Sequence, residues 1–174
     1  MVRLLVLLGL FLIPFVGKSQ RAITEDSSFK DRVYFGGGGG FSGGTDSYGN
    51  RYFYVALNPI MGYMITQQWS TGMGVQWQLY RYPDINYSLN QYGFSPFTRY
   101  NLGNLFAYAE YNVINTSSIS TDVRQYYNRL LAGVGYSLPI SRRGSINGMA
   151  LYDFIYRNNG PFASPWVVRV FFSF

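Results

Sequence analysis

The last ten residues of the chain, PWVVRVFFSF (165–174), place apolar residues at every second position. Alternate side chains of a β-strand point to opposite faces, so one face of this segment is entirely apolar and the other contains Arg169. The apolar face comprises Trp166, Val168, Val170, Phe172 and Phe174. This pattern is typical of a strand whose outer face contacts lipid. The segment therefore predicts a sheet protein that meets a membrane through its strands.

Seven further segments are rich in residues that strands favour, and no segment has a sustained helical period. The predicted strands are 32–40, 52–65, 71–82, 92–101, 105–114, 127–140, 146–157 and 166–174. Their connections alternate in length, beginning with a long one: 41–51, 66–70, 83–91, 102–104, 115–126, 141–145 and 158–165. An even number of strands joined in this way predicts an all-β fold, a closed antiparallel eight-stranded transmembrane β-barrel with up-and-down order over residues 32–174.

Sorting alternate residues separates an apolar face from a polar face in most predicted strands. The clearest apolar sets are Met73, Val75, Trp77 and Leu79, then Leu130, Ala132, Val134, Tyr136 and Leu138. A soluble β-sandwich or lipocalin-like barrel also alternates, but its polar face should contain Lys, Glu and Thr. Here the polar faces contain Gly, Gln, Ser, Asn and single charges, with no Lys in any predicted strand. The pattern favours the membrane barrel.

Glycine and proline interrupt some of the predicted strands. The five glycines at 36–40 are compatible with a phosphate-binding loop, but no GxxxxGK[ST] motif or helix follows them. We interpret them as a place where a barrel strand bends and packs closely. Pro59, Pro96 and Pro139 each remove a ladder donor, which predicts a bulge or a strand end at each.

The N-terminus has the pattern of a secretory signal peptide. Arg3 precedes an apolar run from Leu4 to Val16, and small residues follow near Gln20. The run is too short for a membrane-spanning helix. We therefore predict a cleaved signal peptide at 1–19, followed by a short polar periplasmic lead at 20–31.

The chain resembles small eight-stranded outer-membrane barrels of Gram-negative bacteria, the OmpA/OmpX type, over residues 32–174. The resemblance rests on the signal peptide, the strand count, the loop alternation and the final PWVVRVFFSF. It implies a location in the outer membrane, in contact with its lipid and lipopolysaccharide. It also implies insertion by the β-barrel assembly machinery, which would recognise the aromatic terminal strand. No peptidoglycan-binding domain follows the barrel, so a tethering role is not expected.

Composition excludes several classes of chemistry. The chain contains no Cys and no His, which excludes disulfides, thiol catalysis and the Ser-His-Asp arrangement. Enzymatic outer-membrane barrels such as the phospholipase, the lipid A-modifying enzymes and the omptin proteases use a catalytic His. We therefore expect no enzymatic activity, no cofactor and no metal. The basic residues are scattered among strand ends, so nucleic acid is not an expected partner.

Five ionisable residues fall on inward faces and form a predicted interior charge network: Arg99, Glu110, Arg129, Asp153 and Arg169. Buried charges must pair, so the three arginines are predicted to share the two carboxylates. A polar conduit or ion gate is one function of such a network. A structural plug is the other, and we favour it because side chains fill the interior of an eight-stranded barrel.

Four arginines fall at the loop ends of predicted strands and define a candidate extracellular rim: Arg51, Arg81, Arg124 and Arg157. Tyrosines accompany them, namely Tyr52, Tyr80, Tyr82, Tyr126, Tyr127 and Tyr156. Arginine binds phosphate and tyrosine favours the membrane interface, so the rim is predicted to contact lipopolysaccharide or a partner protein. An ordinary solvated rim with an aromatic girdle is equally compatible with this pattern.

These features predict a non-enzymatic barrel with a structural or interaction role. It would act as an accessory subunit of an outer-membrane complex or as a protein that contacts the cell surface and lipopolysaccharide. The alternative is a narrow channel or a transporter of small hydrophobic ligands.

Overall fold

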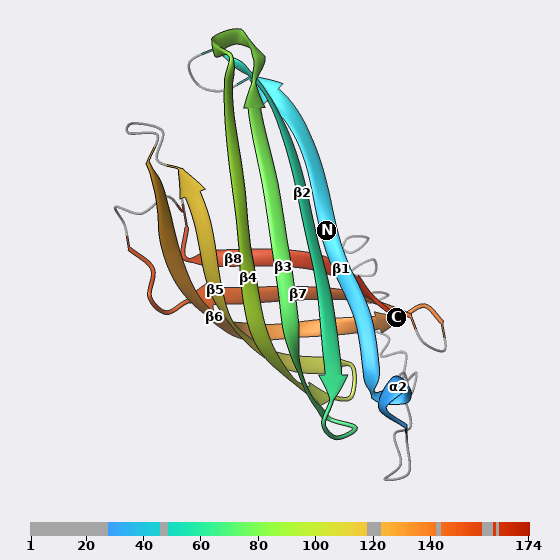
Figure 1. The fold of residues 1–174 in the computed structure, drawn as a ribbon. Helices are drawn as coiled ribbons and strands as arrows, with labels where there is room; N and C mark the ends of the chain where they lie inside the picture. The colour runs from blue at the N-terminus through green and yellow to red at the C-terminus, as the bar shows by residue number, and fades with distance from the viewer. Residues whose placement is uncertain (1–27, 46–48, 118–122, 142–143, 158–161, 163) are drawn as a thin grey trace, which may run out of the picture.

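The computed structural model describes residues 28–45, 49–117, 123–141, 144–157, 162 and 164–174. In these ranges, eight antiparallel strands follow one another in sequence order around a closed barrel (Figure 1). Their bounds are β1 Val33–Thr45, β2 Arg51–Met64, β3 Trp69–Tyr82, β4 Tyr87–Leu102, β5 Leu105–Ser117, β6 Arg124–Pro139, β7 Ser145–Asp153 and β8 Trp166–Ser173. The all-β, closed, up-and-down architecture is thus confirmed.

Two short helical segments accompany the strands. Helix α2 (Phe29–Arg32) precedes β1, and the 3-10 turn η1 (Pro83–Ile85) connects β3 to β4. None of the helices in the described part of the chain is long and apolar enough to cross a membrane. The predicted signal peptide lies outside the described residues, as does the lead up to residue 27.

The end of the predicted lead is ordered against the barrel. Residues 29–31 end the predicted lead and Arg32 begins the first predicted strand, but together they form α2, and the ring of Phe29 stacks on that of Tyr63 at a centroid distance of 5.4 Å. Arg32 donates from Nη1 to the carbonyl oxygen of Ile65 at 3.2 Å. These contacts place the start of the barrel beside the connection between β2 and β3, at what we call the turn end. The opposite end is the loop end.

The predicted alternation of faces holds in the folded strands. Val75 and Val134 on the outer face are 53% and 65% exposed, whereas Leu131 and Leu151 on the inner face are fully buried. Strand β7 is the exception, because it ends at Asp153 and not at Arg157. Ile155, which the alternation placed inside, therefore lies in the turn after β7 and is 42% exposed.

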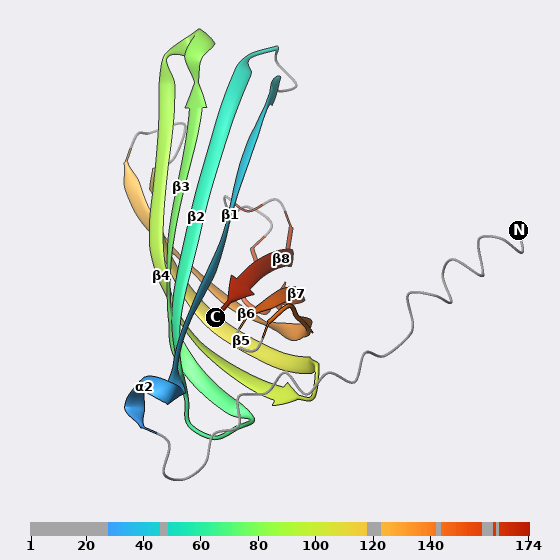
Figure 2. The same ribbon diagram turned by 90° about the vertical axis from the view of Figure 1, so that its right-hand side faces the viewer.

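Strands β1 and β4 are longer at the loop end than the sequence predicts, whereas β2 begins one residue earlier, at Arg51, and β3 ends at Tyr82 as predicted. Strand β1 continues to Thr45, and β4 begins at Tyr87, so most of the predicted loops 41–51 and 83–91 are strand. These four strands have 13 to 16 residues, whereas β7 and β8 have nine and eight. They rise past the rest of the barrel as a tall wall (Figures 1 and 2).

Tyrosines on the inner face hold the tall wall together. The rings of Tyr54 and Tyr80 lie 4.5 Å apart, and Tyr82 contacts both Tyr52 and Tyr87 at 6.1 and 6.3 Å. Such cross-strand aromatic pairs stabilise a sheet beyond its backbone ladder. Ser42 and Gly44, in a segment predicted to be a loop, occupy strand positions opposite Tyr54 and Tyr52.

The prolines interrupt the ladder without shifting its register. Pairing between β2 and β3 stops after Leu57↔Trp77 and resumes at Ile60↔Gly74 with the same offset, so Pro59 creates no bulge. The same is true of Pro96 between β4 and β5. Pro139 is the last residue of β6, as predicted. The bulges expected at the first two prolines are absent because a missing donor removes a bond without adding a residue.

An apolar cluster fills the middle of the barrel. It comprises Phe97, Phe106, Tyr108, Leu131, Met149, Leu151 and Phe171, each at most 6% exposed. Phe97 and Tyr108 stack at 5.3 Å between ring centroids. Side chains from five strands meet here, so this cluster separates the turn end of the interior from the loop end.

Candidate functional site

The structure places all five predicted interior charges on the inner face. Arg99, Glu110, Arg129 and Asp153 are at most 9% exposed, and the side chain of Arg169 is 30% exposed. They separate into two ion pairs and one arginine that pairs with no carboxylate among the described residues.

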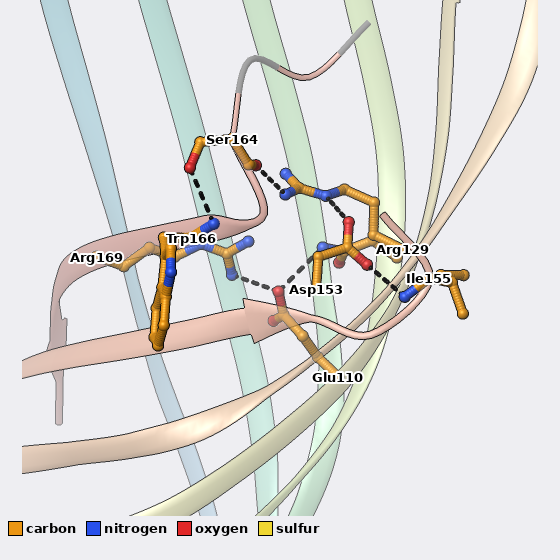
Figure 3. A network of polar contacts seen from close by, with 8 residues as sticks. Glu110, Arg129, Asp153, Ile155, Ser164, Trp166 and Arg169 are labelled. Carbon is orange, nitrogen blue, oxygen red and sulfur yellow. Dashed lines mark hydrogen bonds and ion pairs between the residues drawn. The ribbon is translucent and has the colours of Figure 1, made fainter. Parts of the chain in front are cut away.

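The pair between Arg129 and Asp153 ties the end of β7 to the connection that follows it. Arg129 donates from Nε to Oδ2 of Asp153 at 2.7 Å and from Nη2 to the carbonyl oxygen of Ser164 at 3.3 Å (Figure 3). The guanidinium also lies 4.2 Å from the centroid of the Phe162 ring. Asp153 accepts from the backbone N–H of Ile155 through its other oxygen. One buried pair thus fixes several points of the segment between β7 and β8.

The pair between Glu110 and Arg169 crosses the barrel interior from β5 to β8. Its Nη1–Oε1 distance is 2.7 Å (Figure 3). Tyr108 donates to Oε2 of Glu110 at 3.1 Å, and Asn112 donates to Oε1 at 3.0 Å. Three donors on one carboxylate stabilise its charged form and fix the orientation of the Arg169 side chain.

Arg99 does not share a carboxylate, and the prediction that it would is wrong. Its Nε donates to Asn101, Nη1 to Asn147 and Nη2 to Ser137, at 2.7, 3.2 and 2.7 Å. Its guanidinium lies 3.9 Å from the centroid of the Phe106 ring. Neutral oxygens and an aromatic face therefore replace the expected carboxylate, because Arg99 lies near the turn end and both carboxylates lie farther toward the loop end.

Sequence reasoning missed the neutral members of this turn-end cluster. Asn147 is fully buried, hydrogen-bonds to Ser137 and donates to Oγ of Ser173 at 3.0 Å. Oγ of Ser173 also lies within hydrogen-bonding distance of Oγ of Ser145, at 2.8 Å. The available signal was the recurrence of small polar residues at inward positions of β6, β7 and β8. Together with the apolar cluster, this arrangement fills the turn end and the middle of the interior with packed side chains.

Two of the predicted rim arginines are already bound within the chain. Arg51 forms an ion pair with Asp84 at 2.6 Å and donates a backbone N–H to the same carboxylate at 2.7 Å. This hydrogen-bonding lowers the pKa of Asp84, so the pair is present at neutral pH and is lost only as the pH falls through that lowered pKa. Arg124 donates to Asn115 at 2.7 Å and lies 5.0 Å from the ring centroid of Tyr92. Both arginines therefore brace the rim.

Arg81 and Arg157 differ from these two. Arg81 lies next to the end of β3, on the outer face of the tall wall, and Arg157 lies beyond β7. Within the described residues, neither forms an ion pair. Of the accompanying tyrosines, Tyr52, Tyr80 and Tyr82 face the inner side of the wall, whereas Tyr126 is 73% exposed. The cations available to a partner are thus Arg81 and Arg157.

The terminal strand has the facing that the sequence predicts. Trp166, Val168, Val170, Phe172 and Phe174 are 51% to 79% exposed on the outer surface. Phe174 exchanges both backbone hydrogen bonds with Phe35, at 2.8 and 3.0 Å. The last residue of the chain thereby takes part in closing the barrel.

The described residues contain no cluster of three or more His, Cys, Asp or Glu that could bind a metal ion. Searches against models of protein families, curated proteins and solved structures returned no significant match to this chain. Its function must therefore be argued from its own geometry.

Proposed function

We propose that this chain is a non-enzymatic outer-membrane β-barrel of the OmpA/OmpX architecture, with a structural or interaction role. The outer surface supports a membrane location. Large apolar side chains on every strand are exposed, among them Phe35, Leu57, Met73, Phe94, Leu105, Val134, Tyr152 and Val170. A soluble monomer rarely exposes such a continuous apolar surface.

Aromatic residues at both ends of the exposed band also support this location. Trp69, Tyr100, Tyr136 and Phe174 lie near the turn end, at 41% to 63% exposure. Near the loop end of the short strands, Tyr152 contacts Trp166 and Phe154 at centroid distances of 5.1 and 5.5 Å. Paired aromatic belts are typical of transmembrane barrels. Such belts would fix the depth of this barrel in a bilayer.

The unequal strand lengths suggest where contact with a partner would take place. A strand needs about 9–11 residues to cross a bilayer. β7 and β8, with nine and eight residues, are near that minimum, whereas β4 has 16. A barrel seated by its short side would therefore hold the loop end of the tall wall outside the lipid. We propose that this wall and the adjacent rim contact lipopolysaccharide or a protein of an outer-membrane complex.

The filled interior is the observation that carries the proposed role. The apolar cluster fills the middle of the barrel, and the cluster around Arg99 fills the turn end. The two ion pairs lie on the loop-end side of the apolar cluster. A pore needs a continuous water path, which packed aromatic rings do not leave. Within the described residues these groups contact one another, which supports a structural role.

Purified protein in planar bilayers is therefore expected to give no stable single-channel conductance. A general porin prepared in the same detergent provides the positive control. Heat-dependent migration on a gel verifies that the inserted protein is folded. A reproducible conductance from the folded protein would replace the structural role with the alternative of a narrow channel.

Replacing Arg81 and Arg157 together with Gln is expected to reduce lipopolysaccharide co-purification at least about tenfold, because even one hydrogen bond to a charged group contributes about 1.5–3 kcal/mol. The barrel should remain folded, since neither residue forms an ion pair with another described residue. The matched control, Lys30→Gln with Arg32→Gln, removes two charges at the turn end. If the rim variant and the control variant retain the same amount of lipopolysaccharide, Arg81 and Arg157 do not contribute to lipid contact.

A further inference from the structure

A cavity of about 290 Å³ lies inside the barrel beside the junction of β1 and β8. Residues of β1, β2, β3, β5, β7 and β8 line it, including the glycines Gly38 to Gly40. Its volume is at the lower limit of small-molecule sites, which range over about 300–1,000 Å³. The lining includes Val168 and Val170, whose side chains are 79% and 63% exposed on the outer surface. The cavity thus reaches the barrel wall at this junction.

The wall is thin at this junction because the closing ladder is short. β1 pairs with β8 at Gly36↔Ser173 and Gly37↔Phe172, next to the hydrogen-bonded Phe35 and Phe174, although β1 extends to Thr45. A Cβ atom on Gly38 would lie 2.8 Å from the carbonyl oxygen of Val170, whereas one on Gly40 would have no atom within 4 Å. The two strands diverge between these residues, as both views of the fold show (Figures 1 and 2). We call this divergence the seam.

Two residues with side-chain donors, from different sides of the barrel, line the cavity. Gln76 on β3 is 8% exposed, and its Nε2 has no hydrogen-bond partner among the described residues. A buried amide donor without a partner is costly, so it indicates a missing acceptor. Arg169 on β8 also lines the cavity and uses Nη1 to bind Glu110. A guanidinium has five N–H donors, so further donors remain available to a ligand.

We propose that the cavity binds the carboxylate head of a fatty-acid-like amphiphile whose tail leaves through the seam. The head accepts hydrogen bonds from Gln76 and Arg169, and the tail passes Gly40 and Val168 toward the apolar outer surface. An alkyl tail matches the exposed Val168 and Val170.

The glycines of the seam explain why this route is available. Gly40 occupies an inward position opposite Ala56, and it is the absence of a side chain there that leaves the space empty. Backbone groups at membrane depth are tolerated without a ladder only where they face protein or a cavity. The junction between β1 and β8 lies beside the cavity, so its unpaired backbone groups meet that condition.

The test measures decanoate binding to the purified full chain in amphipol, by displacement of the fluorescent fatty acid parinaric acid. We expect saturable binding with one site per barrel, and at least tenfold weaker binding of decanol, which lacks the charge. Gly40→Leu should abolish binding by filling the cavity. Gly148→Leu is the matched control, because Gly148 on the outer face of β7 also has no atom within 4 Å of an added Cβ. Its affinity should equal that of the unmodified chain.

Gln76→Leu separates a ligand contact from a structural role. It removes an unpartnered donor, so resistance to guanidinium unfolding should not fall, while decanoate binding should weaken about tenfold. Absence of saturable binding by the unmodified chain would overturn the proposal. Unchanged binding by Gly40→Leu would also overturn it, since the ligand would then lie elsewhere. Equal affinity for decanol and decanoate would show that the site does not recognise the carboxylate.

Discussion

Replacing Gly133 with valine is expected to prevent closure of the sheet between β6 and β7. A Cβ atom on Gly133 would lie 2.0 Å from the carbonyl oxygen of Ala150 and 2.9 Å from Cα of Leu151. Both are backbone atoms of the neighbouring strand, so relief requires the strands to separate. Overpacking alone costs about 1–3 kcal/mol, and the broken ladder adds to that cost. The folded fraction after refolding, measured by heat-dependent migration on a gel, should fall sharply.

The matched control for this prediction is Gly148→Val on the adjacent strand. An added Cβ on Gly148 has no atom within 4 Å, so the same change should leave the refolded fraction near that of the unmodified chain. Equal refolding of the two variants would show that β6 and β7 do not approach as closely as described. A loss in both would point to the strand conformation of valine and not to the contact.

Asp153→Ala is expected to lower the free energy of unfolding by about 3–5 kcal/mol, because it leaves the buried Arg129 unpaired. Asp153 is 2% exposed and accepts from Arg129 at 2.7 Å, so water does not replace the lost partner. The backbone N–H of Ile155 loses its acceptor as well. Guanidinium unfolding in detergent, followed by tryptophan fluorescence, measures the change.

Two further variants define the origin of that loss. Asp84→Ala breaks the rim pair with Arg51, in which the arginine side chain is 74% exposed, so its effect on stability should be small. Arg129→Met with Asp153→Leu removes both buried charges and should recover most of the stability lost in Asp153→Ala, since no charge is left unpaired. If the double variant is as unstable as the single one, the cost comes from lost packing around Phe162 and Ser164 and not from the unpaired cation.

The apolar pattern of the outer face was predictable from the sequence because it follows from a two-residue period. In β3, β5, β6 and β8, every second residue is apolar, and this alternation alone determines which face points outward. It does not depend on which strand lies next to it. The extent of β1 and β4 was not predictable in this way. Glycine, serine and asparagine lack a strong strand preference. The backbone ladders to β2 and β3, supported by tyrosine pairs on those strands such as Tyr54 with Tyr80, keep these segments extended.

The positions of the interior charges were predictable, but their partners were not. Alternation places Arg99 inside the barrel, yet its distance along the axis from each carboxylate depends on the stagger of β4 to β8, which the sequence does not state. Neutral partners such as Ser137 and Asn147 have no charge to mark them. The bulges wrongly expected at Pro59 and Pro96 have a similar cause, because a proline shows which donor is missing but not how the strand accommodates the loss.

The short ladder between β1 and β8 also bears on how the molecule assembles. Every other strand pair in the described barrel joins neighbours in the chain, whereas this one joins its two ends. Contacts between distant residues form late because the chain loses more entropy in making them. The nascent sheet would therefore persist with two free edges, the glycine-rich β1 and the aromatic β8. How readily these edges pair with another chain depends on how long the sheet stays open. It does not depend on how tightly the interior packs once the barrel has closed.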